Sequence, residues 1–204
     1  GITLNPSSGI FNFIDTIDVN NYFINVLYLI NDVSNTTIYK LTVKPYFNYI
    51  TGTSIDYGST GASVVPNTNP QGGYFYLPNY YNDINIDYKF GILSFGSTVI
   101  VNQYTIPTVY VYNDISAVYN FNLLMNPKII YADFIPNDKI YDGTTSVIIS
   151  SNKLIGVINN DKVYIDNYNA TFQIIGPDYN IPLFVYNLTL GGPESYNYIL
   201  QYDN

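Results

Sequence analysis

Residues 9–35 read GIFNFIDTIDVNNYFINVLYLINDVSN, and residues 91–117 read GILSFGSTVIVNQYTIPTVYVYNDISA. The second stretch follows the first by 82 positions, and the correspondence extends without a gap over residues 2–49 and 84–131. Of the 48 aligned pairs, 16 are identical. Similarity at a fixed period of this length indicates tandem structural modules.

The repeat predicts where the modules begin and end. Each copy closes on a proline, Pro45 or Pro127, and an apolar stretch follows directly. We therefore expect domains at 1–45, 46–127 and 128–204. Residues 1–45 match only the second half of the repeated module, so this first module is expected to be incomplete. Either the chain continues upstream of the given sequence or another subunit donates strands, which would make the protein a polymerising subunit.

The local patterns predict an all-β fold. Stretches such as TVYVY (108–112), KVYI (162–165) and FVYNLTL (184–190) are rich in β-branched and aromatic residues. Turn sequences such as NPSSG (5–9) separate these stretches, with Gly9 placed to take a positive φ. Modules of about 80 residues with short strands are typical of β-sandwiches. In the last stretch, alternation places four side chains on one face: Phe184, Tyr186, Leu188 and Leu190.

Composition excludes several classes of function. The 204 residues contain no Cys, His, Trp or Arg, and the formal net charge is −8. Nucleic-acid binding requires basic patches, so it is not expected. Thiolate zinc sites and thiol nucleophiles are excluded by the lack of Cys. The longest apolar run, residues 22–30, is far shorter than the roughly 20 residues of a membrane span.

Residues 128–204 resemble the YDG domain, which occurs in repeats of large bacterial surface adhesins. The matching elements follow the order of the family: KIYDGTT (139–145), IGVINNDKVYI (155–165), ATFQIIG (170–176), VYNLTLGG (185–192) and YNYIL (196–200). One departure is Asn160, which stands where the family usually has Gly before the Asp of its central turn. Because Asn also tolerates left-handed geometry, we expect the turn to be kept.

Residues 1–45 and 84–127 resemble the second half of the cadherin-like, immunoglobulin-type domains of microbial surface proteins. The resemblance rests on a GITLNPSSG-like hairpin, a Tyr-x-Ile strand and a final strand ending near Val-x-Pro. It implies tandem immunoglobulin-like (Ig-like) β-sandwich modules, with the first one incomplete. Both families occur in long, surface-exposed stalks, which implies an extracellular place at a cell or virion surface.

The segment Tyr141-Asp142-Gly143 is interpreted as a structural turn. We expect Tyr141 to be a buried anchor, Asp142 to cap nearby amides and Gly143 to supply a permissive φ. No catalytic or cofactor-binding residue is predicted. The acids are 14 Asp and Glu194, mostly flanked by Asn or Gly, and solvated turns account for them better than acid–base chemistry. The chain is therefore expected not to be an enzyme.

Two further kinds of site are weaker candidates. Calcium prefers oxygen ligands, and such ligands cluster at Asp161, Asp166, Asn167 and Asn169 and in the pairs Asn31-Asp32 and Asn113-Asp114. No Asp-x-Asp-x-Asp-Gly loop is present, so ordinary Asx-turns are the alternative reading. Three sequons make Asn35, Asn169 and Asn187 candidates for glycosylation.

These observations favour a structural segment of an extracellular fibre, stalk or adhesin, possibly assembled by strand complementation. Its expected partners are copies of itself or neighbouring modules of a longer chain, without nucleic acid. The alternative is a module that binds a glycan or a protein receptor through tyrosine-rich loops, for example through Tyr80 or Tyr179.

Overall fold

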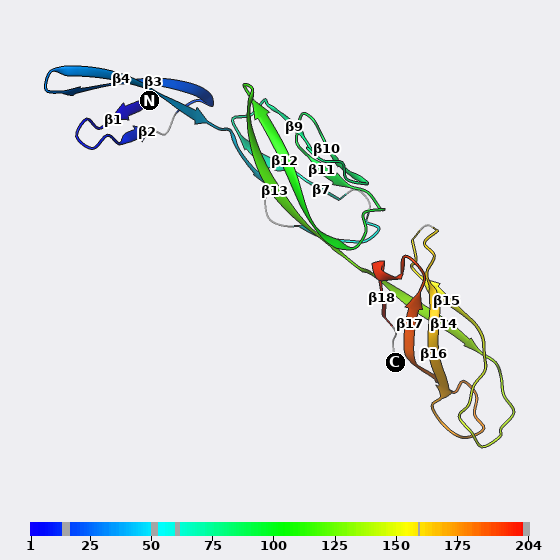
Figure 1. Ribbon diagram of the computed structural model, residues 1–204. Helices are drawn as coiled ribbons and strands as arrows, with labels where there is room; N and C mark the ends of the chain where they lie inside the picture. The colour runs from blue at the N-terminus through cyan, green and yellow to red at the C-terminus, as the bar shows by residue number, and fades with distance from the viewer. Residues whose placement is uncertain (14–16, 50–52, 60–61, 159, 202–204) are drawn as a thin grey trace. The chain divides into compact units, whose positions relative to one another are not determined.

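The computed structural model describes residues 1–13, 17–49, 53–59, 62–158 and 160–201. Its regular structure is almost entirely β-strand (Figure 1), which confirms the predicted all-β class. Among the described residues, no helix has the length and apolar character needed to cross a membrane. The strands of the repeated region, in chain order, are β1 (Ile2–Leu4), β2 (Phe11–Phe13), β3 (Asn20–Ile30), β4 (Val33–Val43), β5 (Tyr46–Tyr49), β6 (Thr53–Asp56), β7 (Ala62–Val64), β8 (Pro66–Asn69), β9 (Tyr74–Tyr76), β10 (Ile84–Ile86), β11 (Leu93–Phe95), β12 (Asn102–Tyr112) and β13 (Ile115–Asn126).

The remaining strands belong to the C-terminal part of the chain. They are β14 (Lys128–Pro136), β15 (Ile149–Ile155), β16 (Tyr164–Phe172), β17 (Leu183–Gly191) and β18 (Tyr198–Gln201), with a short 3-10 helix η1 (Ser195–Asn197) before β18. The chain divides into two compact units. Unit 1 comprises Gly1–Thr53, Gly61–Phe95 and Tyr104–Leu123, and unit 2 comprises Ser54–Thr60, Gly96–Gln103 and Leu124–Asn204. The domain limits at residues 45 and 127 stay a prediction.

The repeat of period 82 is visible strand by strand. β3 begins at Asn20 and β12 at Asn102, which is the same position in the two copies. The β1–β2 pair aligns Ile2 with Phe13, and the β10–β11 pair aligns Ile84 with Phe95, again 82 positions later. The two copies therefore form corresponding strands, and their first hairpins have the same register.

The turns of the two copies also agree. Asn31 and Asp32 join β3 to β4 with φ angles of 48° and 63°, and the corresponding Asn113 and Asp114 have 50° and 59°. Two central residues with positive φ are the requirement of a tight type I′ hairpin, which Asn and Asp tolerate. These two pairs, named above as possible calcium ligands, thus serve as hairpin turns.

The first hairpin of each copy closes in the same way. In NPSSG, the Asn5 side chain accepts hydrogen bonds from the amides of Ser7 and Ser8, and Gly9 has a φ of +69°. In the second copy Asp87 accepts bonds from two amides of its own turn. The prediction of a positive φ at Gly9 is confirmed.

Within unit 1, the second copy and the strands just before it in the sequence share an aromatic core. Phe47, Tyr49, Phe75, Tyr110 and Phe121 are all buried, and neighbouring rings lie 4.6–6.3 Å apart between centroids. The hydroxyl of Tyr49 donates to the Gly91 carbonyl oxygen at 2.7 Å, so this buried polar group is satisfied. β12 and β13 belong to a four-stranded sheet of order β6-β13-β12-β9.

Unit 2 is built on two sheets. β14 is central in the order β15-β14-β18 and pairs in parallel with β18, while β16 and β17 form an antiparallel pair. Phe134 of β14 and Tyr168 of β16 bring their rings to 5.0 Å, which links the two sheets. The buried centre consists of Tyr57, Ile130 and Tyr198, packed against partly buried aliphatic residues.

The predicted facing of β17 is wrong. Phe184 and Tyr186 are exposed and stack on one another, whereas Leu188 and Leu190 are half-buried. Asn187 lies between them with a φ of 55°, where the pairing with β16 is irregular. A bulge of this kind shifts the alternation by one residue, so the two halves of the strand present opposite phases.

Candidate functional site

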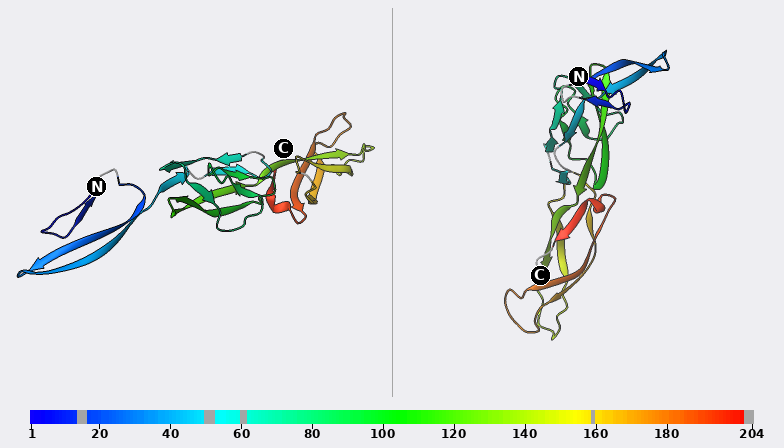
Figure 2. Two further views of the ribbon diagram at one scale, coloured as in Figure 1. Left: turned by 90° about the horizontal axis from the view of Figure 1, so that it is seen from above. Right: turned by 90° about the vertical axis from the view of Figure 1, so that its left-hand side faces the viewer.

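The β3–β4 hairpin forms an open ribbon (Asn20–Val43) that exposes its apolar side chains. Figures 1 and 2 show it as a two-stranded ribbon, and among the described residues no third strand pairs with it. Leu27 is 60% exposed, whereas the corresponding Val109 is 5% exposed; Tyr28 is 47% exposed and Tyr110 is 1% exposed. Because soluble proteins rarely expose contiguous apolar surface of this kind, the ribbon is a candidate interaction surface.

The second copy shows what covers these positions. Along one edge of β12, Val109, Tyr110 and Val111 pair with Tyr76, Phe75 and Tyr74 of β9. On the other side, β13 is flanked by β6. The equivalent edges of β3 and β4 carry no such strands among the described residues. A free strand edge is a template for pairing with another strand.

A third open edge belongs to β2. In the second copy, β11 pairs with β7, so that Leu93 lies opposite Val64 and Phe95 opposite Ala62. The described part of the first copy gives β2 no partner beyond β1. Phe13 is consequently exposed, although the identical Phe95 is buried. Within the residues that the structure describes, the first copy thus has no counterparts of β6, β7 and β9.

The KIYDGTT segment of unit 2 is organised around the ammonium of Lys139. Its Nζ lies 2.8 Å from Asp142 Oδ1 and 2.8–3.1 Å from four oxygens of Thr144 and Ser146. Asp142 Oδ1 also accepts bonds from the amide and hydroxyl of Thr144, each at 2.9 Å. Gly143 has a φ of +75°. The turn is therefore a cation-centred loop, with Asp142 and Gly143 in the roles expected from the sequence.

The polar contacts of this loop change the pKa of one acid, Asp142. Hydrogen bonds from Lys139, together with those from the amide and hydroxyl of Thr144, lower the pKa of Asp142 from 3.8 to about 2. The loop is thus held by an ionised carboxylate over nearly the whole pH range. Tyr141, by contrast, is 59% exposed. The expectation that Tyr141 is a buried anchor is wrong, because Lys139 rather than an aromatic ring holds the loop together.

A second polar cluster lies in the core of unit 2. The hydroxyls of Tyr57 and Tyr198 both donate to Asp161 Oδ2, at 3.0 and 2.5 Å. The Tyr198 hydroxyl also accepts a bond from the Ile158 amide at 3.0 Å, and the two rings meet edge to face at 5.6 Å. Burial, followed by the bond to Asp161, raises the pKa of Tyr57 to about 12. The same causes raise the pKa of Tyr198.

The calcium candidates are divided between two places. Asp161 lies in the turn before β16, where its carboxylate already accepts the two tyrosine hydroxyls. Asp166, Asn167 and Asn169 lie on β16 itself, next to irregularities in its pairing with β17. No group of three or more acidic residues converges on a metal position within the described ranges. Asn160, the departure from the family pattern, has a φ of 62° as expected.

The three sequon asparagines are all exposed. Asn35 lies on β4, Asn169 on β16 and Asn187 on β17. Asn35 donates from its side chain to the Tyr28 hydroxyl at 3.3 Å. Glycosylation of these residues stays a prediction, since exposure is necessary for it but not sufficient.

Sequence reasoning missed two arrangements. Lys139 opens the motif, yet its role depends on Ser146, seven residues away. The spacing of Lys139 and Asp142 could have suggested their ion pair. The partnership of Tyr57 with Asp161 joins residues 104 positions apart, and no local signal could have indicated it.

Comparison with known proteins agrees with part of this description. The family model of the YDG domain matches residues 127–204, so this segment is a YDG domain. The expected resemblance of the C-terminal segment is thereby confirmed. No curated protein matches the chain.

Proposed function

We propose that this chain is a structural, non-enzymatic segment of an extracellular fibre, stalk or adhesin. In this proposal, Ig-like β-sandwich modules precede the YDG domain, and the first module is completed by strands from outside the 204 residues. The observation that carries the proposal is the contrast between the open ribbon and β12–β13. Two segments with corresponding strands differ in burial, and among the described residues flanking strands are found only for β12–β13.

The chemistry of the covering strands follows from the second copy. β9 contributes Tyr74, Phe75 and Tyr76 against the edge of β12, and β7 contributes small residues against β11. Strands of the β5–β9 type, supplied by preceding sequence or by a second subunit, would bury the open ribbon in the same way. Burial of apolar surface on this scale stabilises association by about 25 cal/mol per Å² before the entropic costs of association.

A self-completed variant tests the proposal. A copy of residues 46–82 is placed directly before Gly1, which reproduces the order of the second module. We expect the 204-residue chain to self-associate in sedimentation velocity and to bind a hydrophobic dye. The fused chain should be monomeric, with slower amide exchange in β3 and β4. A monomeric 204-residue chain whose β3–β4 amides exchange as slowly as those of the fusion would contradict the proposal.

A matched control distinguishes specific docking of the added strands from a mere effect of the longer chain. The same fusion carries Phe75→Lys in the added copy only, because Phe75 lies opposite Tyr110 and would there lie opposite Tyr28. We expect this control to self-associate like the starting chain. The source of the missing strands is then decided by the intact mass of the protein from its natural source. A mass well above 23.1 kDa indicates strands in the same polypeptide, and a mass near it indicates a second subunit.

The extracellular location is part of the proposal and needs its own test. It is supported by the YDG domain at 127–204, given the surface stalks in which that family occurs. We expect an antibody against the chain to label intact cells or particles of the source organism. Labelling only after permeabilisation would overturn the location without affecting the proposed module structure.

A further inference from the structure

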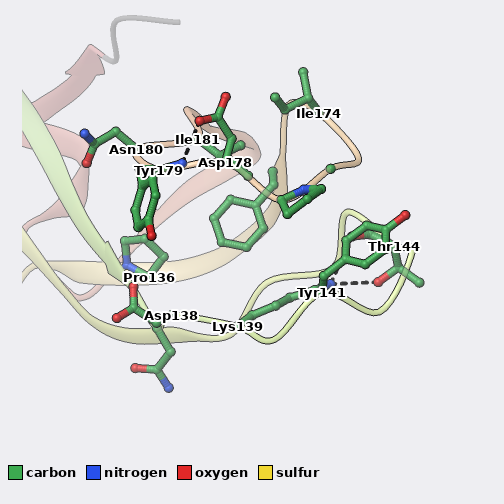
Figure 3. Close-up of a pocket in the computed structure, with 14 residues that line it drawn as sticks. Pro136, Asp138, Lys139, Tyr141, Thr144, Ile174, Asp178, Tyr179, Asn180 and Ile181 are labelled. Atoms are coloured by element: carbon green, nitrogen blue, oxygen red, sulfur yellow. Dashed lines mark hydrogen bonds between the residues drawn. The ribbon is translucent and has the colours of Figure 1, made fainter.

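One end of unit 2 contains a hollow between two loops. One loop runs over residues 136–144 and the other over residues 172–181, and the hollow between them has a volume of about 890 Å³ (Figure 3). Two contacts join the loops at their base: the Phe172 amide donates to the Thr145 carbonyl oxygen at 2.9 Å, and Ser146 forms a β-bridge with Thr171. A volume of this size holds a small organic ligand.

The walls of the hollow combine exposed rings with polar groups. Tyr141 and Tyr179, one from each loop, both line it (Figure 3) and are 59% and 94% exposed. Ile174 and Pro177 add apolar surface, while Asp138 and other polar residues are within the same lining. Such a wall suits a ligand that has apolar faces and many hydroxyls.

The electrostatics of the hollow disfavour an anion. Among the described residues that line the hollow, Lys139 is the only cation. Its ammonium is already surrounded by five oxygens of Asp142, Thr144 and Ser146. Asp138 and Asp178 add negative charge to the rim. Phosphorylated or sialylated ligands would meet these carboxylates without a free partner cation. Carboxylates accept hydrogen bonds from neutral hydroxyl groups readily.

We propose that this hollow binds an uncharged saccharide, with Tyr141 and Tyr179 against sugar rings and the rim carboxylates accepting from sugar hydroxyls. The C–H groups on the face of a sugar ring carry small positive charges, which suit the electron-rich face of a tyrosine. The loop around Lys139 is ordered before binding, which lowers the entropic cost. The site is independent of how the first module is completed.

Titration followed by NMR tests this site on the full chain. The probes are chitotriose, mannotriose and lacto-N-tetraose, with 3′-sialyllactose as an anionic probe. We expect at least one neutral probe to bind with a dissociation constant on the order of millimolar and to shift amides of residues 136–144 and 172–181. Binding that is strongest for 3′-sialyllactose, or no response to any neutral probe, would overturn the proposal.

Three variants locate the binding. Tyr179→Ala and Tyr141→Ala remove exposed rings that make no contribution to the core, and each should weaken binding by about tenfold. Tyr80→Ala is the matched control, because Tyr80 is also highly exposed but lies in unit 1, outside the lining. If Tyr179→Ala and Tyr141→Ala leave the saccharide affinity unchanged, the binding lies elsewhere and the assignment is overturned. The same holds if Tyr80→Ala lowers the affinity as much as they do.

Discussion

The open ribbon β3–β4 and the hairpin β12–β13 differ in burial although their local structure is the same. Both have an Asn-Asp turn with two positive φ angles, and β3 and β12 each contain 11 residues. Tyr28 is nevertheless exposed and Tyr110 buried. Sequence similarity between the copies thus determines the strands and the turn that joins them, whereas burial depends on which other strands are present.

The largest expected effect comes from truncating the identical tyrosines. Tyr110→Ala should lower the free energy of unfolding by about 3–5 kcal/mol, because it removes a buried ring. That variant also removes the hydroxyl that accepts a bond from the Gly73 amide. Tyr28→Ala should change the free energy of unfolding by no more than about 0.5 kcal/mol at concentrations low enough to keep the chain monomeric, where Tyr28 is exposed. Native-state hydrogen exchange of the β12 and β3 amides measures both effects.

The fusion that completes the first module provides a further test of the comparison between Tyr28 and Tyr110. With a copy of residues 46–82 before Gly1, Tyr28 gains the surroundings of Tyr110, so Tyr28→Ala should then approach the loss of Tyr110→Ala. Equal losses for the two tyrosines in the unfused chain would mean that the ribbon is already covered. If Tyr28→Ala still has little effect on the free energy of unfolding of the fusion, the added strands do not dock on the open ribbon.

Much of the fold could be predicted from the sequence because its determinants are local. The repeat of period 82 predicted tandem modules, and the two copies form corresponding strands, β1–β4 and β10–β13. The YDG segment was recognised from motifs in order along the chain. Gly9, Gly143 and Asn160 have the positive φ angles that their turns require.

The parts that sequence reasoning missed depend on distant partners or on small shifts. The phase of β17 changes at Asn187 because of a bulge, which the alternation of residues 184–190 conceals. Tyr141 looks like a strand-end anchor, but the loop closes around Lys139 instead. The hollow between residues 136–144 and 172–181 arises from two loops whose proximity is set by the sheets.

A second, smaller contrast concerns the glycines that close the first hairpins. Gly9 and Gly91 have φ angles of +69° and +68°, so alanine at either position meets a left-handed backbone cost of about 1–2 kcal/mol. A Cβ at Gly91 would also lie 2.7 Å from ring carbons of Phe75, whereas at Gly9 it would meet nothing within 4 Å. Gly91→Ala should therefore cost about 1–3 kcal/mol more than Gly9→Ala.

Urea unfolding of the two glycine variants measures this difference. In the completed fusion, Gly9 would face the copied Phe75, so the gap between the variants should close. An equal cost of the two substitutions in the unfused chain would show that Phe75 moves aside freely. That result would mean that the core around Phe75 is less tightly packed than its ring contacts indicate.

The smallest expected effect compares two Tyr-containing turns, one buried and one exposed. Tyr57→Phe removes a hydroxyl that donates to Asp161 and should cost about 1–2 kcal/mol, while Tyr141→Phe at an exposed loop should change stability by less than about 0.5 kcal/mol. Since the pKa of Tyr57 is raised from 10.0 to about 12, its contribution is complete below pH 10 and is lost as the pH rises towards 12. Tyr57→Phe should therefore flatten the alkaline loss of stability, measured by urea unfolding across this range. An unchanged alkaline slope would assign that loss to the other buried tyrosines with a raised pKa: Tyr198, which also bonds to Asp161, and Tyr49.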